Sequence, residues 1–218
     1  MKIEAIAWDI DGTLIDSEPT HLKALIATCD GYGVDISDLP EDTFVGVSVH
    51  GVWEALVRRF PARLGRDEWI ARINDHYRKL RRELRIQPFA VETILKARDL
   101  GLRQVAVSNS NRSVVDVNLE MLGASGIFDF SLSLDDVAKG KPDPTPYRLA
   151  ANRLGLVPQQ VVAVEDSETG LRSAAAAGCL AVAISADGVR LSPADRRITG
   201  LDELPEILAA ARSGLATA

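Results

Sequence analysis

Residues 3–14 read Ile-Glu-Ala-Ile-Ala-Trp-Asp-Ile-Asp-Gly-Thr-Leu, and this stretch decides the fold that we predict. It opens with a short, largely apolar run that ends abruptly at Asp9. A short apolar run bounded by a polar turn is typical of a buried strand. Similar runs occur at 102–107, 130–134, 161–164 and 180–184, and the first three of these also end at a polar residue.

Helical patterns separate these runs. They cover 89–100, 113–122 and 168–177, and a glycine follows each one where a helix end favours a left-handed residue. Strands that alternate with helices favour a parallel sheet covered on both faces. We therefore predict an α/β fold, a doubly wound, Rossmann-like parallel sheet.

One interval breaks the alternation. Residues 17–85 carry only helical patterns, whereas a direct connection from the first strand to the next needs a single helix. The sequence therefore predicts a helical domain at 17–85, inserted into a catalytic core made of 1–16 and 86–218. Its hinges are expected near 15–18 and 84–88.

Polar residues gather at the predicted strand ends, where doubly wound sheets bind ligands. A lysine in the turn-rich segment 139–144 precedes a further helix. Four segments thus converge on one sheet edge, bringing Asp9 and Asp11, Ser108 and Asn109, Lys141, and Glu165 and Asp166.

The chemistry of these residues suits a phosphate ester and a hard cation. Carboxylates together with substrate phosphate are the ligands that Mg²⁺ prefers, so Asp9, Asp11, Glu165 and Asp166 are candidate metal ligands. Crowding of like charges favours a proton on Asp11, which a leaving oxygen needs. Ser108, Lys141 and the backbone N–H groups around Ile10, Asp11 and Asn109 are candidate partners of the phosphate oxygens.

These motifs together resemble the haloacid dehalogenase-like superfamily. Its first motif is similar to 9–14, Ser108 matches the second, Lys141 the third, and Glu165-Asp166-Ser167 with Gly170 the fourth. The resemblance implies that Asp9 is the nucleophile and Asp11 the acid and base. It also implies that the helical insert is a cap that closes near the active site, and that the four motif residues Asp9, Asp11, Ser108 and Lys141 are catalytic.

Within the superfamily, the chain is most similar to the branch of beta-phosphoglucomutase and phosphoglycolate phosphatase. The resemblance implies a phosphatase acting on a small phosphorylated metabolite, with a phosphosugar mutase as the alternative. Val49 stands where those mutases carry an arginine, whereas His21 matches a hinge histidine of that group. A non-enzymatic receiver-like phospho-acceptor is a third interpretation. Candidate cap residues are Glu18, His21, Gly46, Val47, Ser48 and His50.

Composition limits the partners. The chain has 218 residues and a net charge of −6, which disfavours nucleic-acid binding. No apolar run reaches the length of a membrane span. Cys29 and Cys179 match no metal or redox spacing, so we expect reduced thiols and a cytoplasmic protein. We expect a monomer or a weak homodimer.

Overall fold

The computed structural model describes residues 2–124, 126–186 and 188–213. Its centre is a six-stranded sheet in the order β5-β4-β1-β6-β7-β8, in which every neighbouring pair is parallel. The strands are β1 (Ala5–Trp8), β4 (Arg103–Val107), β5 (Phe130–Leu132), β6 (Val161–Glu165), β7 (Leu180–Ile184) and β8 (Arg196–Ile198). The predicted α/β fold class is confirmed.

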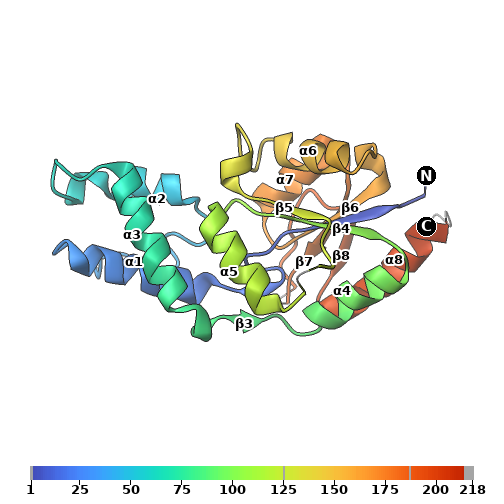
Figure 1. The fold of residues 1–218 in the computed structure, drawn as a ribbon, viewed down its shortest axis with the longest axis horizontal. Helices are drawn as coiled ribbons and strands as arrows, with labels where there is room; N and C mark the ends of the chain where they lie inside the picture. Colours follow the sequence, from blue (N-terminus) through green and yellow to red (C-terminus); the bar gives the residue numbers. More distant parts are fainter. Residues whose placement is uncertain (1, 125, 187, 214–218) are drawn as a thin grey trace.

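Helices cover both faces of the sheet (Figure 1). Ala5 and Ala7 of β1 belong to the apolar core shared with α6 (Thr145–Arg153) and α7 (Glu168–Ala177). Ile6 and Trp8 face the opposite core, which also contains side chains of α4 (Ala90–Asp99), α5 (Arg112–Leu122) and α8 (Leu204–Ser213). Burial on both faces explains why the central strands lack polar alternation.

The helical segment lies beside the sheet, at the left of Figure 1. It contains α1 (Glu18–Gly31), α2 (Val49–Leu56), α3 (Arg66–Lys79) and the short 3₁₀ turns Val57–Arg59 and Arg81–Glu83. Its two ends are joined, because β2 (Ile15–Asp16) pairs antiparallel with β3 (Arg85–Ile86). An aromatic cluster of Trp53, Phe60 and Trp69 packs inside it. The division into a core and a movable cap stays a prediction.

The elements differ from the predicted ones mainly at their ends. β5 stops at Leu132 because Ser133 caps a 3₁₀ turn over Leu134–Asp136. The sequence predicted neither the pairing of β2 with β3 nor the strand β8. Gly101, Gly123 and Gly178 all adopt positive φ angles, as predicted for residues that end helices. Among the described residues, no helix combines the length and apolar character needed to cross a membrane.

Candidate active site

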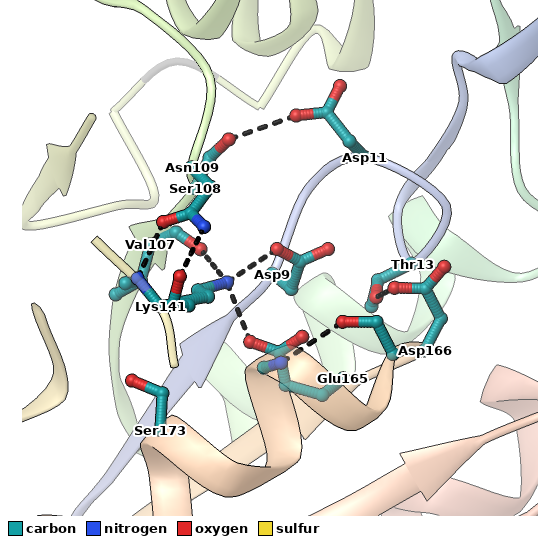
Figure 2. Close-up of polar contacts among 12 residues, drawn as sticks. Asp9, Asp11, Thr13, Val107, Ser108, Asn109, Lys141, Glu165, Asp166 and Ser173 are labelled. Atoms are coloured by element: carbon teal, nitrogen blue, oxygen red, sulfur yellow. Dashed lines mark hydrogen bonds and ion pairs between the residues drawn. The ribbon is translucent and has the colours of Figure 1, made fainter. Parts of the chain in front are cut away.

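The topology places the predicted site residues side by side. Because β1 lies between β4 and β6, the carboxyl ends of these three strands meet. Asp9 follows β1, Ser108 follows β4, and Glu165 is the last residue of β6. Figure 2 shows Asp9 with Lys141 and Glu165 on one side and Asp11 turned toward Ser108 on the other.

Lys141 lies at the centre of this arrangement. Its Nζ is 2.6 Å from Asp9 Oδ1, 2.6 Å from Glu165 Oε1 and 2.7 Å from the carbonyl oxygen of Val107. A lysine ammonium has three N–H donors, so all of them are used within the protein. Burial acts to lower the pKa of Lys141, but the charges of Asp9 and Glu165 outweigh it and raise this pKa above its ordinary value.

Lys141 lies on a loop, and Asn109 fixes that loop. The Asn109 side chain donates to the Lys141 carbonyl oxygen at 2.9 Å and accepts from the Lys141 N–H at 2.8 Å. The Asn109 side chain therefore holds the backbone of Lys141 in place through two hydrogen bonds.

Asp9, Glu165 and Asp166 form a group that we name the carboxylate cluster. One oxygen from each lies within 4.8 Å of the others. Asp9 Oδ2 and Glu165 Oε2 are buried and have no hydrogen-bond partner among the described residues. Burial is the main cause that raises the pKa of Asp9 to about 7 and that of Asp166 to about 7. Unpartnered buried carboxylate oxygens next to a third carboxylate fit a divalent cation with hard oxygen ligands.

Two glycines give the carboxylate cluster its room. A Cβ at Gly12 would lie 1.9 Å from Asp166 Oδ2, and Gly12 has a φ of +86°. A Cβ at Gly170 would lie 1.8 Å from Glu165 Oε2. Any side chain at either position would displace a carboxylate of the cluster.

Asp11 occupies a different environment, which we name the Asp11 pocket. Hydroxyls and other donors approach both of its carboxylate oxygens. Oδ1 has Ser17 Oγ at 2.8 Å, Asn118 Nδ2 at 2.9 Å and His21 Nε2 at 3.3 Å, and Oδ2 has Ser108 Oγ and Ser110 Oγ, each at 2.9 Å. Tyr77 of α3 donates to Asn118 Oδ1 at 2.7 Å and stacks on the His21 ring. The helical segment and the core thus both hold this carboxylate.

These donors reverse one expectation from the sequence. Burial acts to raise the pKa of Asp11, but the hydrogen bond and Coulombic interaction with His21, together with the bonds from Ser17 and Ser110, outweigh it and hold the pKa below its ordinary value. Asp11 is therefore ionised here, whereas crowding alone predicted that it holds a proton. Its carboxylate also lies outside the carboxylate cluster, although the sequence placed it among the metal ligands.

The backbone N–H groups that we predicted to bind phosphate oxygens are those of Ile10, Asp11 and Asn109. Among the backbone hydrogen bonds of residues 2–124, 126–186 and 188–213, none uses the N–H of Ile10, Asp11 or Asn109. Ile10 directly follows Asp9, Asp11 comes next, and Asn109 directly follows Ser108. That these N–H groups bind phosphate oxygens stays a prediction.

The predicted cap residues are only partly brought to the site. His21 contacts Asp11, and Glu18 Oε1 accepts from the Gly46 N–H at 3.4 Å. Ser48 caps α2 by accepting from the Gly51 N–H, and Val47 is exposed. The contacts of the described residues do not connect Gly46, Val47, Ser48 or His50 to Asp9 or Asp11.

Two cavities are lined in part by predicted cap residues or by residues of the site. One of about 550 Å³ lies between α3 and the start of α5, and His50, Asn74, Asn111 and Arg112 are among its lining residues. His50 Nδ1 is buried without a partner among the described residues. The other, of about 580 Å³, is lined by Gly12, Asp166 and Phe89 among others.

Sequence reasoning missed several residues of the site. Ser17, Ser110 and Asn118 contact Asp11, and Tyr147 donates to Glu165 Oε1. The position of Ser110, two residues after Ser108 at a strand end, was a usable signal. Tyr77 lies with Trp69 and Ile73 on the buried stripe of α3, so nothing in the sequence indicated separately that its hydroxyl has a role.

Known proteins are similar to this chain in sequence and in fold. A family model described as haloacid dehalogenase-like hydrolase matches residues 3–178. Protein CbbY of Rhodobacter capsulatus is 32% identical over 216 residues, with 92% of this chain and 95% of that protein covered. Fructose-1-phosphate phosphatase YqaB of Escherichia coli is 28% identical, with 83% and 96% covered. The crystal structure of CbbY from Rhodobacter sphaeroides in complex with phosphate has a TM-score of 0.83 at 28% identity, with 93% and 96% covered.

Proposed function

The chain belongs to the haloacid dehalogenase-like hydrolases, and we propose that it is a Mg²⁺-dependent phosphatase acting through an aspartyl-phosphate. Its substrate is a small phosphate ester, a sugar phosphate or a phosphoglycolate-like compound. One observation carries the proposal. Two members of the carboxylate cluster, Asp9 and Glu165, pair with Lys141, and their Oδ2 and Oε2 atoms are buried without partners among the described residues.

Asp9, Glu165 and Asp166 are the residues that would hold the cation. Bound Mg²⁺ supplies charge neutralisation for the carboxylates and for the phosphate oxygens. Lys141 adds a fixed positive charge, and the N–H groups of Ile10, Asp11 and Asn109 add neutral donors. This combination suits a phosphoryl group whose charge is spread over its oxygens.

The reaction follows from the two aspartates. A carboxylate oxygen of Asp9 attacks phosphorus, the ester P–O bond breaks, and the leaving oxygen takes a proton from Asp11. Asp11 then takes a proton from water, whose oxygen attacks the aspartyl-phosphate and releases inorganic phosphate and free Asp9. The donors of the Asp11 pocket suit the ionised, base form of Asp11. The acid step requires Asp11 to take up a proton from solvent, to leave some of these donors and to turn toward the substrate.

The helical segment is proposed to act as a cap that selects the leaving group. The cavity lined by His50, Asn74 and Asn111 lies between it and the core, and these three polar side chains could bind the hydroxyls of a leaving group. The relative YqaB is named for a sugar phosphate, fructose 1-phosphate, which supports this substrate class. Cys29 and Cys179 are both buried and free, which supports the proposed cytoplasmic location.

A phosphosugar mutase is the second candidate, because His21 contacts Asp11 and matches the hinge histidine of the mutases. In a mutase, the aspartyl-phosphate donates to a sugar hydroxyl in place of water. Release of inorganic phosphate from hexose 1-phosphates, measured beside the formation of isomers, separates the two activities. Isomer formation without phosphate release would replace the phosphatase proposal.

The proposed function is tested with Asp9→Asn. Wild-type turnover of p-nitrophenyl phosphate should require Mg²⁺ and stop with EDTA, and the variant should lose at least about 10³-fold in kcat because its amide is not a nucleophile. Asp38→Asn is the matched control, since Asp38 is an exposed partner of Arg59. Full activity of Asp9→Asn would refute the mechanism. A panel of sugar phosphates, phosphoglycolate and nucleotides then identifies the preferred ester.

A further inference from the structure

Tyr147 has no part in the reaction steps above, yet it lies directly against the site. It belongs to α6, is fully buried, and donates its hydroxyl to Glu165 Oε1. The Lys141 Nζ lies 5.4 Å from the centre of its ring. We propose that Tyr147 is a positioning residue, which fixes Glu165 so that Oε2 is the oxygen presented to a divalent cation. This inference rests on the proposed function.

The two carboxylate oxygens of Glu165 have different surroundings. Oε1 takes both donors, from Lys141 and from Tyr147, whereas Oε2 is buried and has none among the described residues. A tyrosine hydroxyl keeps its proton at neutral pH, so that of Tyr147 is a donor to Glu165. Because both donors bind Oε1, Oε2 is the oxygen that remains to bind a cation.

Gly170 constrains the same carboxylate from the opposite side. Glu165 Oε2 and Oε1 lie 1.8 and 2.4 Å from the place where a Cβ of residue 170 would be. Gly170 lies in the first turn of α7 and is not among the glycines with positive φ, so its backbone does not require glycine. Space for Glu165 is the remaining physical reason for a glycine in a helix, where alanine is more favourable.

If the role of Tyr147 is purely structural, a different result is expected. In that case the Tyr147 hydroxyl only satisfies a buried carboxylate, and its loss lowers stability without changing the affinity for a cation. In a positioning role its loss weakens cation binding, because the residues that orient metal ligands typically contribute 10- to 100-fold in affinity.

The experiment measures Mg²⁺ binding by isothermal titration calorimetry, without substrate. Tyr147→Phe keeps the ring and removes the hydroxyl, and Gly170→Ala displaces Glu165 while keeping Tyr147. We expect each variant to weaken the Mg²⁺ Kd by about tenfold or more. Because both act on Glu165, the double variant should lose less than the product of the two.

The chain offers matched controls for both variants. Tyr32 donates to Glu68 on the surface, so Tyr32→Phe removes a Tyr–Glu hydrogen bond away from the site. Gly31 lies at the end of α1 with open space around it, so Gly31→Ala adds a methyl group to a helix without a clash. Both controls should bind Mg²⁺ with the wild-type Kd.

The outcomes are separable. A Kd for Tyr147→Phe within twofold of the wild type, in a folded protein that turns over p-nitrophenyl phosphate, overturns the positioning role and leaves the proposed function intact. Wild-type protein that neither binds Mg²⁺ nor hydrolyses phosphate esters overturns the proposed function and this inference together. Weakened binding in both site variants, with unchanged controls, supports the positioning role.

Discussion

Asp9 and Asp11 are two residues apart, but their surroundings are opposite in character. Asp9 shares a buried region with Glu165, Asp166 and Lys141, and its Oδ2 has no partner among the described residues. Asp11 has donors on both oxygens, from the hinge, from the helical segment and from the core. The pKa of Asp9 is raised, and that of Asp11 is lowered.

The difference teaches how one short loop can give two identical side chains different tasks. The carboxylate cluster is short of positive charge, which favours a cation and a phosphate beside Asp9. The Asp11 pocket consists mostly of neutral donors, which stabilise a carboxylate without needing a metal. The first region depends on charge and the second on hydrogen bonds, and each prediction below tests that contrast.

The largest effect is expected for Lys141→Met. Removal of the ammonium leaves Asp9 and Glu165 buried without their shared cation, which should cost about 3–5 kcal/mol in the free energy of unfolding of the metal-free protein. Urea unfolding in EDTA measures this loss. Lys23→Met is the control, because Lys23 pairs with Glu83 at the surface, where a pair contributes at most about 1 kcal/mol. A loss at residue 141 no larger than the control would contradict the central role of charge.

The pH dependence of stability should have opposite signs in the two regions. Asp9 and Asp166 have pKa values raised to about 7, so their stabilisation of the metal-free protein is present below about pH 4 and is lost as the pH rises through 7. Asp11 has a lowered pKa, so its contribution is present above about pH 4 and is lost only in stronger acid.

Urea unfolding in EDTA should therefore show a fall of about 3 kcal/mol between pH 5 and pH 8, which saturating Mg²⁺ removes by binding the ionised carboxylates. A stability that is flat over this range, or that falls equally with Mg²⁺, would contradict the raised pKa values of the carboxylate cluster.

The contrast also explains what the sequence could predict. Asp9, Ser108 and Glu165 follow apolar runs. The carboxyl ends of parallel strands meet at one edge of the sheet, independently of the conformation of the loops. The fold and the carboxylate cluster were therefore predictable. Lys141 lies on a loop, and its place was indicated by the turn-rich segment 139–144 before a helix and by its match to the third motif.

The Asp11 pocket was far less predictable, because its donors come from distant parts of the chain. Asn118 is one of the buried positions of α5, and Tyr77 belongs to the stripe of α3, so neither breaks the pattern of its own helix. The contact between Tyr77 and Asn118 depends on how α3 packs against α5, and the periodicity of apolar residues in each helix does not predict this packing. The protonation of Asp11 was predicted from local crowding, and the interactions with His21, Ser17 and Ser110 reversed it.

The smallest effect gives the sharpest test, because the same substitution at the two positions should change stability in opposite directions. Asp11→Asn loses charge-assisted bonds and turns an amide toward the Ser108 and Ser110 hydroxyls, so the metal-free protein should lose about 2 kcal/mol at pH 8. Asp9→Asn removes one of three crowded carboxylates, so the same protein should gain about 1 kcal/mol although its activity is lost. Urea unfolding in EDTA measures both. If both variants are destabilised equally, the environments of the two aspartates do not differ as their contacts indicate.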